Sequence, residues 1–200
     1  MAPLGEVREQ PERVAWLLFL NLVTAGYVLT AFGLRFVFPS LSVEGKAAWV
    51  LFASPVRLFQ LFIAKLAVYT ILLFAVVGSI ALAGTLPLSP SLPLLSAFTF
   101  LLALVAVTTV AISLAFGVLW PNFNESNPDR LTTSAGGLAT TFVCLAYVAV
   151  MGWLAQRSAL HLFDGRSPVE PLLLGLAVSA AIVGSVMGAA RRKISRVEIV

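Results

Sequence analysis

The spacing of the charged residues constrains the fold of this chain more than any other feature. Four stretches without Asp, Glu, Lys or Arg lie between Arg13 and Arg35, Lys65 and Glu125, Arg130 and Arg157, and Glu170 and Arg191. A helix that crosses a bilayer needs about 20 mostly apolar residues, and each stretch is long enough for one. We expect two helices in the second stretch, because the three prolines of TLPLSPSLP (85–93) would break a single helix.

The chain is therefore predicted to be all-α: one transmembrane domain over 1–200, a polytopic bundle of about five membrane-spanning helices with short interfacial cytoplasmic helices. The apolar runs are continuous, which favours helices over the alternating strands of a barrel. Composition agrees, since 60% of the residues are hydrophobic and 11% are charged, against about 45–50% and about 25% in soluble domains. The predicted spans are 14–34, 58–84, 94–118, 135–156 and 171–190, and the cytoplasmic segments are 35–57, 119–134 and 191–200.

The distribution of Lys and Arg predicts the orientation, because cytoplasmic loops carry an excess of both. With the C-terminus in the cytoplasm, nine of the 13 lie inside and four lie outside. The four outside are Arg8, Arg13, Arg157 and Arg166. In an alternative, the N-terminus lies inside and 14–34 is a signal peptide or anchor, but the basic tail would then lie outside.

The sequence lacks the residue patterns that catalysis, metal binding or nucleotide binding would need. No Asp, Glu, His or Arg lies deep inside a predicted span, and His161 has no partner at metal-ligand spacing. No Ser or Cys has a base nearby in sequence, and Cys144 lies in an apolar run. There is no G-x-x-x-x-G-K-[ST] loop for nucleotide phosphates. We therefore expect no catalytic, cofactor-binding or metal-binding residue on this chain, and no enzyme.

The polar and small residues inside the spans have more than one interpretation. Asn21 and scattered Ser and Thr could line a polar path, or could form hydrogen bonds between helices and to their own helix. In the last span Ala180, Gly184 and Gly188 have the spacing that lets two helices approach closely. These three residues are expected to pack within the bundle or, alternatively, in a dimer seam.

Two cytoplasmic segments carry most of the information. In 38–57, an apolar stretch between prolines predicts an interfacial helix or, alternatively, an irregular connector. Its candidate residues are Glu44, Gly45, Lys46 and Trp49. In the second segment, WPNFNESNPDR (120–130), the Asn-Pro-Asp sequence is typical of a helix start. It could also be only a capped loop, or hold a cation. The candidates here are Asn122, Asn124, Glu125, Asn127, Pro128, Asp129 and Arg130.

Together the two segments resemble a known family. P-S-L-S-V-E-G-K-A-A-W-V-L with S-P, followed by W-P-N-F-N-E-S-N-P with S-A-G-G, resembles the C-terminal part of permease subunits of ATP-binding cassette (ABC) exporters of the type-2 class. The resemblance covers about 35–155. It implies a permease component that forms part of a translocation path and is driven by a separate ATPase subunit, with the candidate residues of both segments coupling the two.

The resemblance also implies the surroundings of the chain. ATP would be bound by the partner ATPase and not by this chain, and a second permease chain or a missing N-terminal half would complete the path. The protein would lie in the plasma or inner membrane as a multi-pass protein, with the lipid bilayer and no nucleic acid as a partner. A secondary carrier or channel, or a non-transporting membrane scaffold or assembly subunit, are the alternatives.

Overall fold

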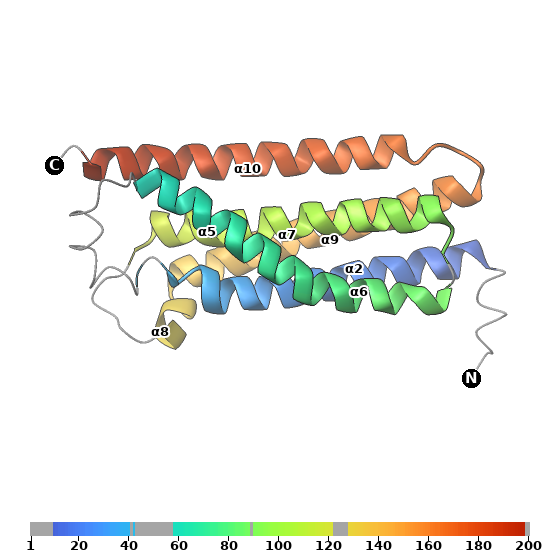
Figure 1. Ribbon diagram of the computed structural model, residues 1–200, viewed down its shortest axis with the longest axis horizontal. Coiled ribbons are helices and arrows are strands. Elements are labelled where there is room, and N and C mark those ends of the chain that lie inside the picture. The colour runs from blue at the N-terminus through green and yellow to red at the C-terminus, as the bar shows by residue number, and fades with distance from the viewer. Residues whose placement is uncertain (1–9, 41, 43–57, 89, 122–127, 199–200) are drawn as a thin grey trace.

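The computed structural model describes residues 10–40, 42, 58–88, 90–121 and 128–198. Within these ranges, five long helical segments run side by side in alternating directions, so the two ends of the chain lie at opposite ends of the bundle (Figure 1). Each segment is long and apolar enough to cross a membrane. The prediction of an all-α bundle with about five spanning helices is thereby confirmed.

The five segments are built from the following elements. The first is α2 (Pro11–Phe32), which continues without a break into the π-helical turn η1 (Gly33–Val37). The second joins α5 (Leu58–Leu73), the π-helical turn η3 (Phe74–Gly78), α6 (Ser79–Thr85) and a 3-10 turn, η4 (Leu86–Leu88). The others are α7 (Leu92–Leu119), α9 (Ala135–Phe163) and α10 (Val169–Glu198), and the short α8 (Pro128–Thr132) precedes α9.

The helix ends follow from local sequence. Prolines occupy the first turn of α2 and of α7, where a missing N–H costs no hydrogen bond. The α9–α10 turn closes at Gly165, whose φ of 69° suits glycine. Around it, Gly165 N donates to Leu162 O (3.2 Å) and Arg166 N donates to His161 O (2.7 Å), a Schellman ending. In contrast, α10 continues past the predicted end at residue 190, because 189–198 contains no Gly or Pro.

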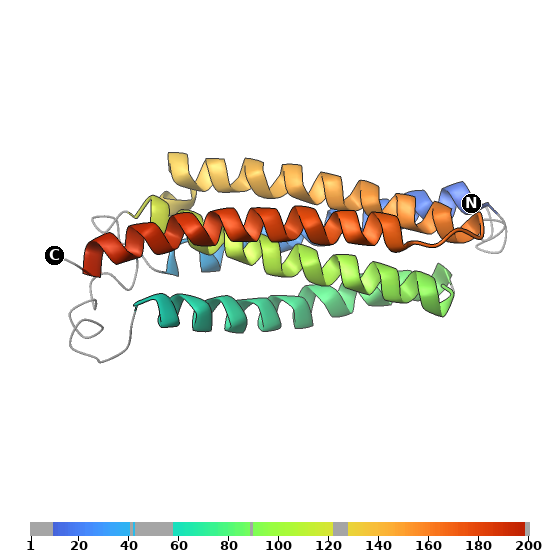
Figure 2. The same cartoon turned by 90° about the horizontal axis from the view of Figure 1, so that it is seen from above.

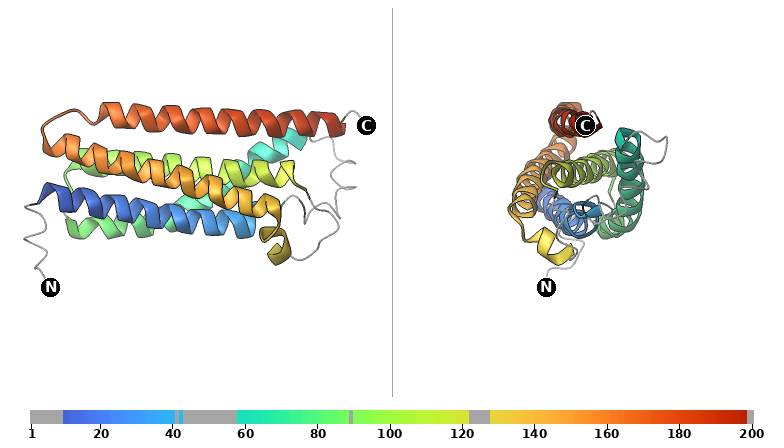
Figure 3. Two further views of the ribbon diagram at one scale, coloured as in Figure 1. Left: turned by 180° about the vertical axis from the view of Figure 1, so that it is seen from behind. Right: turned by 90° about the vertical axis from the view of Figure 1, so that its left-hand side faces the viewer.

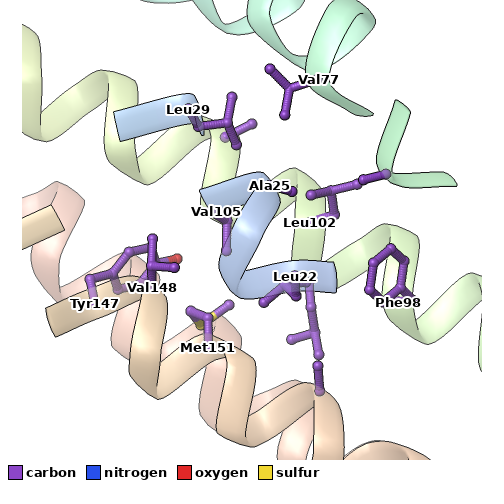
Figure 4. Close-up of a cluster of buried hydrophobic side chains, with 14 of the residues drawn as sticks. Leu22, Ala25, Leu29, Val77, Phe98, Leu102, Val105, Tyr147, Val148 and Met151 are labelled. Atoms are coloured by element: carbon purple, nitrogen blue, oxygen red, sulfur yellow. The ribbon is translucent and has the colours of Figure 1, made fainter. Parts of the chain in front are cut away.

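The helices share the core unequally. Within an apolar 18-residue stretch of α7, 72% of the residues are buried, whereas in the corresponding stretch of α10 only 11% are buried. The end-on view of Figure 3 shows α7 surrounded by the other segments and α10 at one edge, and Figure 2 shows α10 in front of α7, with α9 on one side and α5 on the other. The centre of the core is formed by α2, α7 and α9, where Leu22, Leu102 and Met151 are at most 1% exposed (Figure 4). α7 is thus the central and most buried of the five segments.

Candidate functional site

Positive charge collects at one end of the bundle. Among the side chains that the structure describes, this end holds six cations and no Asp or Glu, whereas the opposite end mixes Glu12, Asp164 and Glu170 with three arginines. We name it the basic end, and its cations are Arg35, Lys65, Arg130, Arg191, Arg192 and Lys193. It lies on the left in Figure 1, where α10 ends and α5 begins.

Two contacts of α10 tie the helix ends together there. The Nζ atom of Lys193 donates a hydrogen bond to the carbonyl oxygen of Leu119, at 2.6 Å. This carbonyl is in the last turn of α7, where helix carbonyls have no partner in their own helix and attract cations. The guanidinium of Arg191 lies over the aromatic ring of Phe59 in α5, 5.6 Å from the ring centre. α10 is therefore fastened to both α7 and α5.

Close packing joins η1, α7 and α9 at the same end. A Cβ on Gly117 would lie 2.4 Å from the carbonyl oxygen of Phe38, and one on Gly136 would lie 2.8 Å from Cβ of Trp120. Both distances are shorter than real contacts allow, so only glycine fits at either position. The ring of Trp120 packs against Phe116, with ring centres 5.2 Å apart. The end of η1, the end of α7 and the start of α9 therefore fit together through glycines.

The junction of α8 and α9 is built by one serine. Ser134 is the N-cap of α9: its Oγ accepts a hydrogen bond from Gly137 N (3.3 Å) and donates to Leu131 O (2.6 Å). Leu131 is 2% exposed, so α8 is anchored to the bundle by a buried side chain. The S-A-G-G sequence is thus a helix cap followed by two buried glycines, and α8 begins at Pro128, where the sequence predicts a helix start.

A buried polar cluster links α7, α9 and α10 in the middle of the bundle. The hydroxyl of Tyr147 lies 2.7 Å from Ser179 Oγ, 3.2 Å from Thr108 Oγ1 and 3.2 Å from Leu104 O. Ser179 Oγ donates its own proton to Gly175 O (2.7 Å), so Tyr147 is the donor to Ser179. Sequence reasoning missed Tyr147 and the specific role of Lys193. The available signal for Tyr147 was its position in mid-span, far from the interfaces where tyrosine is enriched.

The other polar side chains inside the spans serve the helices themselves. Asn21 Nδ2 donates to Ala81 O (2.9 Å), which joins α2 to α6. Thr109, Ser113 and Thr140 each donate to a carbonyl of their own helix four residues earlier. Of the two interpretations left open by the sequence, hydrogen bonding within and between helices is the one seen at these residues.

The structure describes only part of the predicted site. Its described ranges exclude Glu44, Gly45, Lys46, Trp49, Asn122, Asn124, Glu125 and Asn127, and with them most of the 38–57 segment that is predicted to contain an interfacial helix. Pro128 and Asp129 form the first turn of α8, and Arg130 is exposed in the same helix. On α10, Ala180 is exposed, and nothing lies within 4 Å of a Cβ built on Gly184 or Gly188. Close packing within the bundle is not seen at these two glycines, and a contact with another molecule stays a prediction.

Comparison with known proteins gives one match. Residues 7–186 match a protein family described as "Putative ATP-binding cassette". No curated protein and no solved structure matches the chain.

This match corrects three predictions. The description names an ATP-binding cassette, the ATPase type of protein, and not a permease, so the identification with permease subunits of type-2 exporters is wrong. The assignment as a permease component driven by a separate ATPase is contradicted for the same reason, and a carrier, channel or scaffold fits the description no better. The expectation that the chain is no enzyme also conflicts with an ATPase-type family.

The error has a physical origin. The permease resemblance rested on two short segments, and the described part of one of them is explained by capping and close packing at Ser134 and Gly136. The expectation of no enzyme rested on a missing G-x-x-x-x-G-K-[ST] loop. That loop is one way to cradle phosphates, and its absence does not separate a chain from an ATP-hydrolysing assembly.

Proposed function

The chain belongs to the family described as an ATP-binding cassette, and from this premise we propose that it is the membrane-embedded part of an ATP-hydrolysing assembly. In this proposal a partner subunit holds the nucleotide, and the chain contributes to ATP turnover through its contacts with that subunit. Two observations support assigning the membrane-spanning role to this chain. The matched residues include four of the five apolar segments in full and most of the fifth, and the described residues form helices that are suited to lipid.

The basic end is proposed to face the cytoplasm, where ATP is available. Nine of the 13 Lys and Arg residues belong to the segments on that side, and juxtamembrane cations favour the cytoplasmic face. The C-terminus would then be cytoplasmic in a plasma or inner membrane. Trp120 at the basic end and Trp16 and Trp153 toward the other end are each about half exposed, as is usual for tryptophans at the two interfaces of a membrane.

The observation that carries the proposal is the joining of helices at the basic end. Lys193 binds the end of α7, and Gly117 and Gly136 hold η1, α7 and α9 in close contact. A displacement of the 120–134 segment would therefore be transmitted to η1, α7 and α9 through their close packing, and to α10 through the bond from Lys193. We propose that 120–134 and 38–57 contact the nucleotide-binding partner, with the candidate residues of each segment forming the contact.

Of the five spans, α10 would lose the fewest stabilising contacts if it shifted during such a displacement. It has the smallest buried share of the five spans, and Ser179 keeps its bond to Gly175 O when the helix moves. Tyr147 would keep acceptors on α7, at Leu104 O and Thr108 Oγ1. Because neither hydroxyl is left without a partner, separation of α10 from α9 costs little in hydrogen bonding.

The experiment is a reconstitution with matched charge variants. The tagged chain and the nucleotide-binding subunit that co-purifies with it are placed in lipid nanodiscs, and the rate of ATP hydrolysis is measured. Combined Glu125→Gln, Asp129→Asn and Arg130→Gln should lower complex formation or the ATPase rate. The control, Asp164→Asn and Glu170→Gln with Arg166→Gln at the opposite end, makes the same change of charge at exposed positions and should change neither. Intact complex formation and ATPase rate in the first variant would contradict the proposed contact.

A further inference from the structure

The length of α10 places two charges at opposite surfaces of a bilayer. Glu170 and Arg191 bracket the uncharged stretch 171–190 of this helix. With a rise of about 1.5 Å per residue, the two residues are roughly 32 Å apart along the axis. The hydrocarbon core of a bilayer is about 30 Å thick. Arg191 therefore lies at the level of the lipid phosphates, with Arg192 directly after it.

An aromatic ring holds Arg191 in place at that level. Its guanidinium lies 5.6 Å from the ring centre of Phe59, which itself stacks on Phe62 with ring centres 6.1 Å apart. A guanidinium over an aromatic face keeps its N–H donors at the edge of the ring, where they can bind an anion. Arg191 and Arg192 are both exposed. Two cations of one helix end are thus presented beside the start of α5.

The two helices that meet there diverge farther into the membrane. α5 begins beside the end of α10 and then crosses the bundle toward α6, away from α10 (Figures 1 and 3). On α10, Gly188 and Gly184 lie about one and two turns before Arg191 on the same face of the helix, and a Cβ at either position has nothing within 4 Å. On α5, Ile63 lies one turn after Phe59, on the same face of the helix, and is 38% exposed. These apolar surfaces lie below the cationic pair, as acyl chains lie below a phosphate.

We propose that the seam between α5 and α10 at the basic end binds an anionic phospholipid, with its phosphate on Arg191 and Arg192 and its acyl chains along the diverging helices. The planar guanidinium matches phosphate oxygens with paired N–H donors. No Asp or Glu with a described side chain lies at this end to repel an anionic headgroup. The proposal rests on the membrane position of the helices and does not depend on a nucleotide-binding partner.

The test compares two double variants with the same change of charge. The purified full chain in detergent receives equal amounts of phosphatidylglycerol and phosphatidylcholine, and native mass spectrometry measures the ratio of the two bound lipids. The wild-type chain should retain phosphatidylglycerol preferentially. Arg191→Gln with Arg192→Gln should weaken that retention about fivefold for each charge removed. The control is Arg157→Gln with Arg166→Gln, since Arg157 also lies over a ring, 5.0 Å from the centre of Trp153.

Each outcome decides the proposal. Loss of preference in the first variant, with retention in the control, supports it. Equal retention of the two lipids by the wild type, or equal loss in both variants, overturns it, because net charge alone would then explain the binding. Displacement of the lipid by inorganic phosphate would also overturn it in favour of a simple anion site. Arg191→Lys with Arg192→Lys keeps the charge and should give an intermediate preference, which guards against misfolding of the glutamine variant.

Discussion

Replacing Gly26 by alanine should weaken the contact between α2 and α9, and the structure gives the reason in distances. A Cβ at this position would lie 2.4 Å from Cγ1 and 2.7 Å from Cγ2 of Val148. Carbon atoms pack at about 3.5–4.0 Å, so the helices would have to separate by roughly 1 Å. Val148 is 1% exposed and branched at Cβ, so it has no free rotamer to turn into.

The magnitude follows from a matched control. Overpacking a core costs about 1–3 kcal/mol, whereas Gly→Ala in a helix gains up to about 1 kcal/mol of propensity. Gly184→Ala makes the same exchange with nothing within 4 Å of the new Cβ. The propensity gain cancels in the comparison, so Gly26→Ala should be less stable than Gly184→Ala by about 1–3 kcal/mol.

The assay is equilibrium unfolding by sodium dodecyl sulfate from dodecyl maltoside micelles, followed by circular dichroism. Truncating the neighbour, Val148→Ala, should relieve the clash, so the double variant with Gly26→Ala should be more stable than the sum of the two single changes. Equal stability of Gly26→Ala and Gly184→Ala, or strict additivity in the double variant, would refute the packing argument.

Three further predictions use the same unfolding assay. A double-mutant cycle of Tyr147→Phe and Ser179→Ala should give a coupling of about 0.6 kcal/mol, the average for hydrogen bonds between membrane helices; zero coupling would show that no bond joins α9 and α10 there. Lys193→Met removes the donor to the end of α7 and should cost about 1 kcal/mol, whereas the exposed Arg166→Met should cost less than half as much. Gly165→Ala places a side chain at a φ of 69° and should destabilise the turn by about 1–2 kcal/mol; an unchanged midpoint would contradict this.

The charge gaps predicted five long apolar helices because charged side chains are costly in hydrocarbon and a crossing helix needs about 20 mostly apolar residues. The helix ends shifted where local chemistry decided: Pro11 starts α2 before residue 14, and α10 continues through its basic residues. The apolar composition of a helix does not say how deeply it is buried when lipid is the solvent. α7 and α10 each contain a strongly apolar 18-residue stretch, yet 72% of the residues are buried in that of α7 and 11% in that of α10.

The candidate site was less accessible to sequence reasoning. The start of α8 at Pro128 and the cap at Ser134 follow from short local patterns that a sequence displays directly. The hydrogen bond from Lys193 to Leu119 O joins residues 74 positions apart, so no local sequence pattern indicates it. The fit of Gly117 against Phe38 O likewise depends on how two helix ends meet in three dimensions.

The location of the nucleotide tests the central proposal most directly. The assembly, reconstituted in nanodiscs, is irradiated with a photoreactive ATP analogue, and the labelled polypeptide is identified by mass and by competition with ATP. The account predicts ATP-protectable label on the partner subunit, none on this chain, and less label when the 120–134 segment carries the charge substitutions. ATP-protectable label on this chain, with or without the partner present, would contradict it.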